Sequence, residues 1–544
     1  MLPLALVLFC SQFVSLDASP TVQLGKTTLV GREISSVQQE FFGNIPYADP
    51  PLAGLRFRAP VLKSSLDPGP FNATEYGPAC LQIATGLTLN EMSEDCLTIN
   101  VLRPAGTSSD SKLPVMFWTY GGGFVGGQAS TSNASLIVAQ SVARGTPIIF
   151  INFNYRLGPL GFPRGQEAGG QGAVNLGIKD QIAALQWVQM NIESFGGDKN
   201  KVTMFGQSAG SVMTSVLFLN PSIVCNLARG AIFESGYQGT APLFSPARDE
   251  TEWETFVSGV PSCSDIATSG STFGCLAQAN TTEILQGFAL VSAVSTTLTP
   301  WPPVLDGPGG LIPDFPSALF QSGQFARLPF IAGTVLDEGT TFVPQTINST
   351  EEILESILSL FSPSSSPTTL EESAETVLQL YPDIPALGSP FGTGNSTFGL
   401  SSQFKRAAAI IGDSDFQAQR RLWIETAANA GVKTFGYLFT EPQPTPSALG
   451  VFHASELVYV FGKPGNTSPA SEELSRIMTD YWVSFVTSLT PNDGLGVARP
   501  EWAQYTPQNK TLMQLNDANL TMIPDDYRAD QITFLNSDPA IWRR

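Results

Sequence analysis

The chain has 544 residues, of which 42% are hydrophobic and only 14% are charged. This composition provides for a large buried core and excludes extended disorder. The 28 basic and 47 acidic residues give a net charge of −19, which would repel phosphate backbones and anionic membranes. Nucleic acid is therefore not an expected partner, and solubility explains the acidic balance.

Residues 1–14 form an apolar run that is too short to span a bilayer, and small residues follow it. We predict a signal peptide over residues 1–18, although no Lys or Arg precedes the apolar run. No linker, charge block or repeat divides the remainder, so residues 19–544 are expected to form one domain. No second apolar stretch suggests a transmembrane helix, and we expect a secreted, extracellular protein.

N-glycosylation sequons recur along the chain and support a secretory route, in which cysteines can oxidise. Their asparagines are Asn72, Asn133, Asn280, Asn348, Asn395, Asn466, Asn509 and Asn519. Cys10 would leave with the leader, so an odd number of the 6 cysteines remains. Close neighbours can pair as Cys80 with Cys96 and Cys263 with Cys275. This pairing leaves Cys225, which we expect to be a buried, inert thiol.

Short runs of apolar, β-branched and aromatic residues predict buried parallel strands. These runs span residues 115–120, 148–153, 202–205, 231–233, 330–332 and 434–439. Between two of them, Ile178, Ile182, Leu185, Val188 and Ile192 recur at the spacing of an amphipathic helix with one buried stripe. The alternation predicts an α/β fold with a mostly parallel sheet and helices on both faces.

The alternation breaks over residues 249–328 and 343–402, which we interpret as insertions that cover the sheet. A helix is predicted to begin after Ser349 in the second insertion. Its apolar stripe consists of Ile353, Leu354, Ile357, Leu358 and Phe361. Core packing is the usual role of such a stripe, and the alternative is that it also lines an acyl pocket.

A nucleophile motif follows the strand at 202–205. Gly206, Gln207, Ser208, Ala209 and Gly210 match GxSxG, and a helix-compatible run begins directly after them. A sharp strand-to-helix turn strains the backbone of the nucleophile, and small residues on either side remove the resulting clashes. The motif alone arises often by chance, but chance does not supply the flanking strand and helix. We therefore predict that Ser208 is a catalytic nucleophile.

A serine hydroxyl needs a base at neutral pH, and the only histidine in the sequence is His453, after the strand at 434–439. A lone histidine is more often incidental, but the chain order of serine, acid and histidine favours a catalytic role. Asp337 or Glu338, after the strand at 330–332, would supply the acid that orients the imidazole. Their spacing does not distinguish between them.

Gly121, Gly122 and Gly123 directly follow the strand at 115–120. Residues without side chains can direct backbone N–H groups at a developing oxyanion, although a glycine triplet can also be only a flexible turn. Because Ala209 could add a further N–H group, this segment fits the glycine-rich loop of esterases and lipases.

Together these motifs resemble the type-B carboxylesterase/lipase family, which includes lipases, sterol esterases and cholinesterases. The resemblance continues through residues 42–48, 55–57, 94–101, 154–158, 180–188 and 195–198. It implies an α/β-hydrolase fold with large insertions over the active site, and neither a cofactor nor a metal. It also implies the two disulfides named above, Glu338 as the acid, and a buried serine near it at Ser235. The implied oxyanion donors are Gly122, Gly123 and Ala209.

Two positions depart from the family pattern. The residue before the nucleophile is commonly Glu but is Gln207 here, which removes a negative charge beside the imidazole. The loop between Cys80 and Cys96 lacks the tryptophan with which cholinesterases bind choline, so a choline ester is not expected. The same loop is short and contains Gly86, which costs a helix about 1 kcal/mol relative to alanine. We therefore expect no working lid.

The resemblance thus implies a secreted serine hydrolase that acts on small-molecule or lipid carboxylic esters. A lipase or sterol esterase and a feruloyl-type esterase are the alternatives within enzymes. A non-catalytic adhesion module is the alternative outside them, and the intact motifs argue against it.

Overall fold

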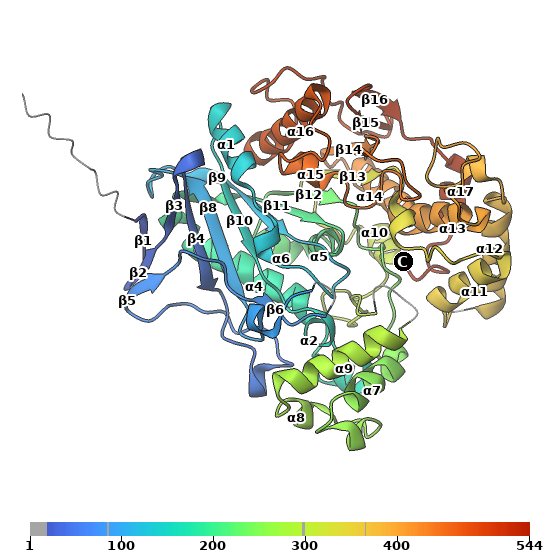
Figure 1. The fold of residues 1–544 in the computed structure, drawn as a ribbon, viewed down its shortest axis with the longest axis horizontal. Helices are drawn as coiled ribbons and strands as arrows, with labels where there is room; N and C mark the ends of the chain where they lie inside the picture. The colour runs from blue at the N-terminus through green and yellow to red at the C-terminus, as the bar shows by residue number, and fades with distance from the viewer. Residues whose placement is uncertain (1–18, 84–85, 296–299, 365) are drawn as a thin grey trace, which may run out of the picture.

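The computed structural model describes residues 19–83, 86–295, 300–364 and 366–544 (Figure 1). The predicted signal peptide, residues 1–18, lies outside these residues. In the described chain the main sheet has 11 strands in the order β16-β15-β14-β13-β12-β11-β9-β10-β8-β4-β3. All neighbours from β15 to β10 in this order are parallel. Antiparallel pairs extend the sheet at both ends.

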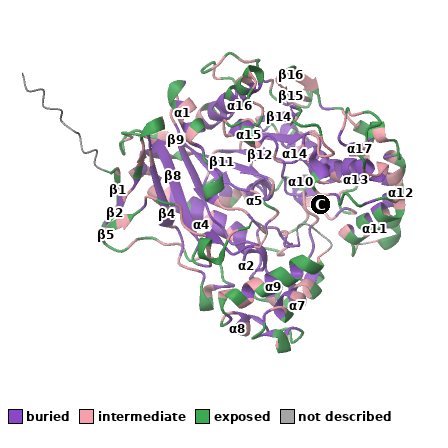
Figure 2. Ribbon diagram, viewed as in Figure 1, coloured by how far each residue is buried: buried purple, intermediate pink, exposed green. Residues whose placement is uncertain are grey.

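All six predicted runs lie on strands of this sheet. The strands are β3 (Arg32–Ile34), β4 (Gln39–Pro46), β8 (Thr98–Pro104), β9 (Leu113–Thr119), β10 (Ile149–Phe153), β11 (Gly197–Gln207), β12 (Gly230–Glu234), β13 (Phe330–Val335), β14 (Thr434–Phe439), β15 (Thr511–Leu515) and β16 (Thr521–Pro524). Every residue of β10, β12, β13 and β14 is buried, as Figure 2 shows in purple. Burial on both faces explains why these strands read as continuous apolar runs.

Two smaller sheets lie outside the main one in the described chain. They contain β1 (Thr21–Leu24), β2 (Thr27–Val30) and β5 (Gly69–Asn72), and β6 (Ala79–Cys80) with β7 (Met92–Ser93). The helices that lie outside the two predicted insertions, apart from α13, are α1 (Ser135–Ala143), α2 (Gly158–Gly161), α3 (Gly165–Gly170), α4 (Leu176–Asn191), α5 (Ala209–Leu217), α6 (Pro221–Val224), α14 (Ala418–Asn429), α15 (Leu457–Val460), α16 (Pro469–Ser488) and α17 (Ala529–Ser537). The predicted amphipathic helix is α4, and the structure confirms it.

The two predicted insertions form helices of their own. The first holds α7 (Glu250–Ser258), α8 (Phe273–Leu276), α9 (Thr281–Val294) and α10 (Pro316–Gln321), and the second holds α11 (Thr350–Phe361) and α12 (Pro367–Leu380), followed by α13 (Ser402–Gly412). In Figure 1, α7 to α9 form one group at the lower edge, and α11 to α13 form another at the right. The two groups therefore flank the sheet from different sides.

Side-chain caps define the first residues of two insertion helices. Ser349 Oγ accepts the backbone N–H of Glu352 at 3.2 Å, so α11 begins where the sequence predicted. At α9, Asn280 Oδ1 accepts the N–H of Glu283 at 3.0 Å, and Glu283 Oε2 accepts the N–H of Asn280 at 3.3 Å. This reciprocal pair is a capping box. Asn280 is thus both a sequon asparagine and a helix cap.

The structure contains both predicted disulfides. Cys80 bonds to Cys96 with a Cα–Cα distance of 5.1 Å, and Cys263 bonds to Cys275 with a Cα–Cα distance of 5.8 Å. The prediction for Cys225 is wrong, because its thiol is exposed rather than buried. Cys225 directly follows the four-residue helix α6. Val224, the last residue of this helix, is buried, and the next residue, Cys225, lies at the surface.

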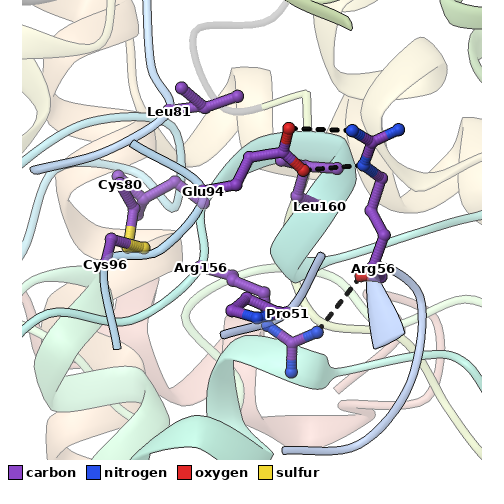
Figure 3. Close-up of a pocket in the computed structure, with 9 residues that line it drawn as sticks. Pro51, Arg56, Cys80, Leu81, Glu94, Cys96, Arg156 and Leu160 are labelled. Atoms are coloured by element: carbon purple, nitrogen blue, oxygen red, sulfur yellow. Dashed lines mark hydrogen bonds and ion pairs between the residues drawn. A yellow bond between two sulfur atoms is a disulfide. The ribbon is translucent and has the colours of Figure 1, made fainter. Parts of the chain in front are cut away.

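A buried ion pair anchors the loop between Cys80 and Cys96 at Glu94 (Figure 3). Arg56 donates to both carboxylate oxygens of Glu94, at 2.6 and 2.8 Å, and a cavity of only about 10 Å³ separates this pair from the disulfide. Such a cavity has room for one water molecule at most. The only helical turn in the described part of the loop is the short segment Leu89–Glu91. The described part of the loop is therefore anchored by the disulfide and by Glu94.

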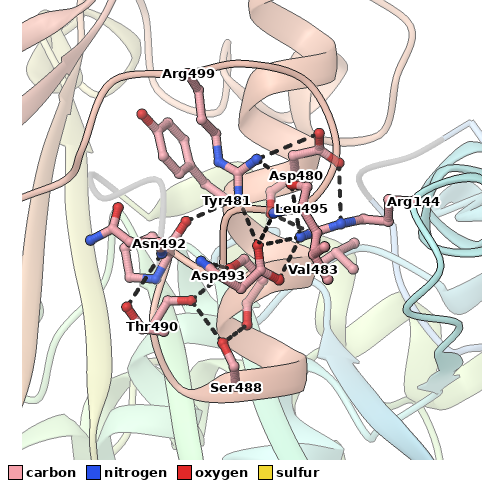
Figure 4. Close-up of polar contacts among 12 residues, drawn as sticks. Arg144, Asp480, Tyr481, Val483, Ser488, Thr490, Asn492, Asp493, Leu495 and Arg499 are labelled. Carbon is pink, nitrogen blue, oxygen red and sulfur yellow. Dashed lines mark hydrogen bonds and ion pairs between the residues drawn. The ribbon is translucent and has the colours of Figure 1, made fainter.

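A second set of buried charges connects α1 with α16 and the loop that follows it (Figure 4). Asp493 binds Arg144 at 2.5 Å and Arg499 at 3.1 Å, and Asp480 lies 3.7 Å from each of the two arginines. Asp480 also accepts the backbone N–H of Val497 at 2.6 Å. We call Arg144, Asp480, Asp493 and Arg499 the ion cluster.

The surface carries the sequons. Their asparagines are exposed at Asn72, Asn133, Asn280, Asn348, Asn395, Asn509 and Asn519, and half-buried at Asn466. Of the helices in the described residues, none combines the length and the apolar character needed to cross a membrane.

Candidate active site

Ser208 occupies the junction between β11 and α5. Its backbone has φ 53° and ψ −130°, a conformation that a residue with a side chain rarely adopts. The turn is tight, because a Cβ on Gly210 would lie 2.1 Å from the carbonyl oxygen of Thr119. Only glycine fits there. The strain and the small neighbours are those that the sequence predicted for a nucleophile.

His453 and Glu338 meet beside this turn. Glu338 follows β13, and His453 lies in the loop after β14, the strand that pairs with β13. The distance between His453 Nδ1 and Glu338 Oε2 is 2.6 Å, and both side chains are buried. The other carboxylate oxygen of Glu338 accepts the backbone N–H of Val335 at 2.9 Å. These two bonds fix the direction of the carboxylate toward the imidazole.

Asp337 points elsewhere, which distinguishes the two acids that spacing could not. Its Oδ1 accepts Ser389 Oγ and the N–H of Phe391, both at 2.8 Å. Its Oδ2 accepts the N–H of Val451 at 2.8 Å. Asp337 therefore holds the loop that carries His453, and it is Glu338 that contacts the ring.

The far side of the imidazole faces Gln207. The distance from Gln207 Nε2 to His453 Nε2 is 3.3 Å. If the amide donates, Nε2 is the acceptor and Nδ1 carries its proton toward Glu338, which is the tautomer a general base needs. Among the described residues the Ser208 hydroxyl has no hydrogen-bond partner. The imidazole is therefore oriented by Glu338 and Gln207, whereas the serine hydroxyl is not yet bonded to it. Such bonds often tighten only when substrate binds.

The glycine loop lies directly against the nucleophile. A Cβ on Gly121 would be 2.7 Å from Cβ of Ser208. Gly123 and Ala209 line the same cavity as Ser208, whereas Gly122 is not among the described residues that line it. Gly122 has φ 108°, and its carbonyl accepts the N–H groups of Val125 and Gly126, each at 3.1 Å. It shapes the turn that presents Gly123.

Ser208 opens onto a cavity of about 1010 Å³. Both predicted insertions contribute to its walls. The apolar lining includes Phe124, Val212, Val343, Ile347, Ile353, Ile357, Ile410 and Ile411. Ile353 and Ile357 belong to the stripe of α11, so this stripe both packs in the core and faces the cavity. The volume is in the range of sites that bury most of a bound ligand.

Comparison with known proteins now decides the family. Residues 18–535 match the model of the carboxylesterase family. The chain belongs to this family. It is therefore a carboxylic-ester hydrolase, as the motifs implied.

Relatives match this carboxylesterase along almost its whole length. Lipase 2 of Geotrichum candidum is 34% identical, and the match covers 98% of each chain. Secreted lipase 1 of Botryotinia fuckeliana is 34% identical over 95% of this chain and 93% of its own. The solved structure of Aspergillus niger EstA has a TM-score of 0.83 at 26% identity and covers 97% of this chain and 99% of its own. The predicted α/β-hydrolase fold is confirmed.

Beneath the histidine this carboxylesterase buries polar groups that few donors satisfy. Both carboxylate oxygens of Glu456 and the hydroxyls of Ser235, Tyr437 and Ser455 lack hydrogen-bond partners among the described residues. Burial, reinforced by the charge of Glu338, raises the pKa of Glu456 to about 8. Burial and the nearby Glu456 likewise raise the pKa of Glu234, whose Oε1 accepts Trp482 Nε1 at 2.8 Å.

Sequence reasoning missed Glu456 and the aromatic rings that flank the imidazole of this carboxylesterase. Phe342 and Phe416 have ring centroids 4.9 and 5.0 Å from that of His453, and 5.4 Å from each other. The position of Phe342, four residues after Glu338, and that of Glu456, three residues after His453, are signals that could have been used. No pattern in the sequence indicates Phe416.

Proposed function

We propose that this carboxylesterase is a secreted serine hydrolase in which Ser208, His453 and Glu338 form the catalytic triad. The observation that supports this most is the strained Ser208 on a large cavity, beside an imidazole held at 2.6 Å by a buried glutamate. Its substrates are carboxylic esters with an apolar acyl or alcohol part.

The proposed reaction proceeds through an acyl-enzyme. The Ser208 hydroxyl displaces the Gln207 amide at His453 Nε2, gives its proton to that nitrogen and attacks the ester carbonyl. Glu338 stabilises the imidazolium. The N–H groups of Gly123 and Ala209 stabilise the oxyanion, and Gly122 shapes the turn that presents Gly123. The imidazolium then protonates the leaving alcohol. Water, deprotonated by the same imidazole, releases the carboxylic acid and restores Ser208.

The cavity supports an apolar substrate group. Burial of an acyl chain against its isoleucine-rich wall would favour binding by about 0.8 kcal/mol for each methylene group. Among the described residues that line it, five carboxylates outnumber two guanidiniums, so a neutral ester fits better than an anionic one; these residues are Asp249, Glu252, Glu352, Glu355 and Asp415, with Arg164 and Arg248.

Secretion is supported by three observations. The apolar run at 1–14 has the pattern of a leader, and the sequon asparagines lie at the surface. Two relatives are named secreted lipase 1 and secreted triacylglycerol lipase LIP1.

A panel of p-nitrophenyl esters with acyl chains of increasing length tests the activity. We expect turnover that depends on Ser208, and covalent labelling of its tryptic peptide by a fluorophosphonate. Purified, folded protein that neither hydrolyses any member nor takes up the label would favour a non-catalytic module.

A lipase acting on emulsified triacylglycerol is the second candidate, because the relatives carry that name. The anchored loop between Cys80 and Cys96 argues against a lid, so activity on tributyrin should rise hyperbolically through its solubility limit. A steep increase that begins only when emulsion forms would mean that a working lid exists and that lipase is the better name.

A further inference from the structure

A π-helical segment, Asp413–Gln417, interrupts the long helix formed by α13 and α14. Such segments are rare and frequently occur at functional sites. Here the extra residue in the turn brings Phe416 against the imidazole of His453 and places both Asp415 and Phe416 on the wall of the cavity. The segment therefore connects helix geometry with the candidate base.

Hydrogen bonds and an ion pair fix the first and last residues of this segment, Asp413 and Gln417. Gln417 Oε1 accepts Thr334 Oγ1 at 2.7 Å and Gln417 Nε2 donates to the carbonyl of Val335 at 2.8 Å, which ties the segment to β13. Asp413 accepts Arg528 Nε and Nη2, both at 2.6 Å. These bonds hold the first and last residues, and leave the middle to other contacts.

Arg544 holds the middle. Its guanidinium donates to the carbonyl of Ser414 and to the carboxylate of Asp415, and it lies over the ring of Phe361. The side chain is only 3% exposed, so this charge is paired away from bulk water. Phe416 is the residue directly after the two that Arg544 binds.

We propose that Arg544 is a positioning residue for the catalytic imidazole, acting through Ser414 and Asp415 to keep Phe416 against His453. This inference rests on the proposed function, since it assigns His453 as the base. Without Arg544, the Ser414 carbonyl keeps only the amide of Gln419 as a side-chain donor among the described residues, and the Asp415 carboxylate keeps only the hydroxyl of Ser414. Asp415 can then turn toward water in the cavity that it lines, and Phe416 moves with the turn.

The expected kinetic effect falls on turnover rather than on binding. If the imidazole leaves its productive orientation, it must return to that orientation before each proton transfer. Even a small misplacement of a catalytic group lowers the rate strongly. For Arg544→Ala we expect kcat to fall about tenfold on a short p-nitrophenyl ester, with KM changed by less than about twofold. Arg544→Lys keeps the positive charge but loses the planar guanidinium, so its kcat should lie between those of the wild type and Arg544→Ala. It also provides the test if Arg544→Ala does not fold.

A double-mutant cycle with Phe416→Leu tests the route. If Arg544 acts through Phe416, Arg544→Ala should cost less than about twofold in a Phe416→Leu background. The same tenfold loss in both backgrounds, or a loss carried by KM alone, would overturn the proposal. Arg543→Ala is the matched control, because Arg543 lies over Phe244 and Phe315 instead.

A spectroscopic readout separates this proposal from the proposed function. Because the sequence has one histidine, labelling histidine with ¹³C at Cε1 alone gives a single imidazole C–H signal, which the ring currents of Phe342 and Phe416 displace. Arg544→Ala and Phe416→Leu should both move that signal, and Arg543→Ala should not. A signal that Arg544→Ala leaves in place refutes the proposal, even in an active enzyme. A signal that moves in a protein without esterase activity refutes only the proposed function.

Discussion

The ion cluster and the polar groups beneath His453 are both buried, but their charges are balanced differently. In the ion cluster, two arginines face two aspartates, and Asp480 and Asp493 each accept backbone N–H groups in addition. Beneath the imidazole, no other described residue supplies the Glu456 carboxylate with a cation or a hydrogen-bond donor, and the carboxylate of its neighbour Glu234 accepts a single bond. Folding alone favours the first arrangement, since unpaired buried polar groups are costly.

The difference suggests a division of roles. The ion cluster ties α1, α16 and the following loop together, so its removal should cost stability and not turnover. The groups around His453 should show the opposite, because their arrangement serves proton transfer at a cost to the fold. Four sets of substitutions test this division.

The largest effect is expected at the nucleophile and the base. Ser208→Ala or His453→Ala should lower kcat by about 10⁶-fold, and the double variant should be little worse than either, because the two residues act as one unit. Thermal unfolding should be nearly unchanged. Losses that multiply in the double variant would contradict a shared step, and a lowered melting temperature in both would erase the contrast with the ion cluster.

Glu338→Gln should reduce kcat by up to about 10⁴-fold through loss of the correct tautomer and of imidazolium stabilisation. Asp337→Asn is its neighbouring control and should cost much less, because Asp337 binds Ser389, Phe391 and Val451 rather than the ring. Steady-state kinetics on one ester measure both. A reversed order would make Asp337 the acid.

Asp480→Ala should lower the free energy of unfolding by about 3–5 kcal/mol, since it leaves buried arginine charge uncompensated. Turnover per folded molecule should stay at the wild-type value. The control on the same helix is Glu473→Ala, which removes an ion pair to Arg476 between side chains that are 44% and 50% exposed. We expect at most about 1 kcal/mol there. Equal losses by urea unfolding would show that the ion cluster does not stabilise the fold.

The most gradual effect is a change in the pH dependence of stability. With the pKa of Glu456 raised to about 8, the folded protein holds a proton that an unfolded glutamate loses near pH 4.3. Stability should therefore fall as pH rises between these values, by at most about 1.4 kcal/mol per unit. In Glu456→Gln this slope should be shallower, although Glu234 retains part of it. An unchanged slope from pH 5 to 8 would mean that Glu456 is ionised in the folded state.

The sequence predicted the parallel strands at the centre of the sheet because strands that are buried on both faces consist of consecutive apolar residues. It did not indicate the outer strands β3, β4, β15 and β16, whose residues alternate or are only partly buried. Cys225 was misplaced because a short helix at the surface has the same local composition as a buried one.

In the candidate site, the motifs located Ser208 and the glycine loop because each directly follows a strand, and His453 because it is the only histidine in the sequence. Local spacing could not choose between Asp337 and Glu338, since the choice depends on which carboxylate the distant His453 loop meets. The contacts of Arg544 with Ser414 and Asp415 span about a quarter of the chain and follow no local pattern. The family resemblance, rather than a local pattern, placed Gln207 beside the imidazole, where the structure has it.

The capping box at α9 affects how glycosylation of this protein can be studied. A sugar on Asn280 would bond to Nδ2, whereas the cap uses Oδ1, so the modified residue can still hold the N–H of Glu283. The usual sequon knockout, Asn280→Gln, would remove the glycan and the cap together and cost the helix about 1 kcal/mol. Thr282→Ala removes the sequon and leaves the cap in place. Only this second variant attributes a change in stability to the sugar.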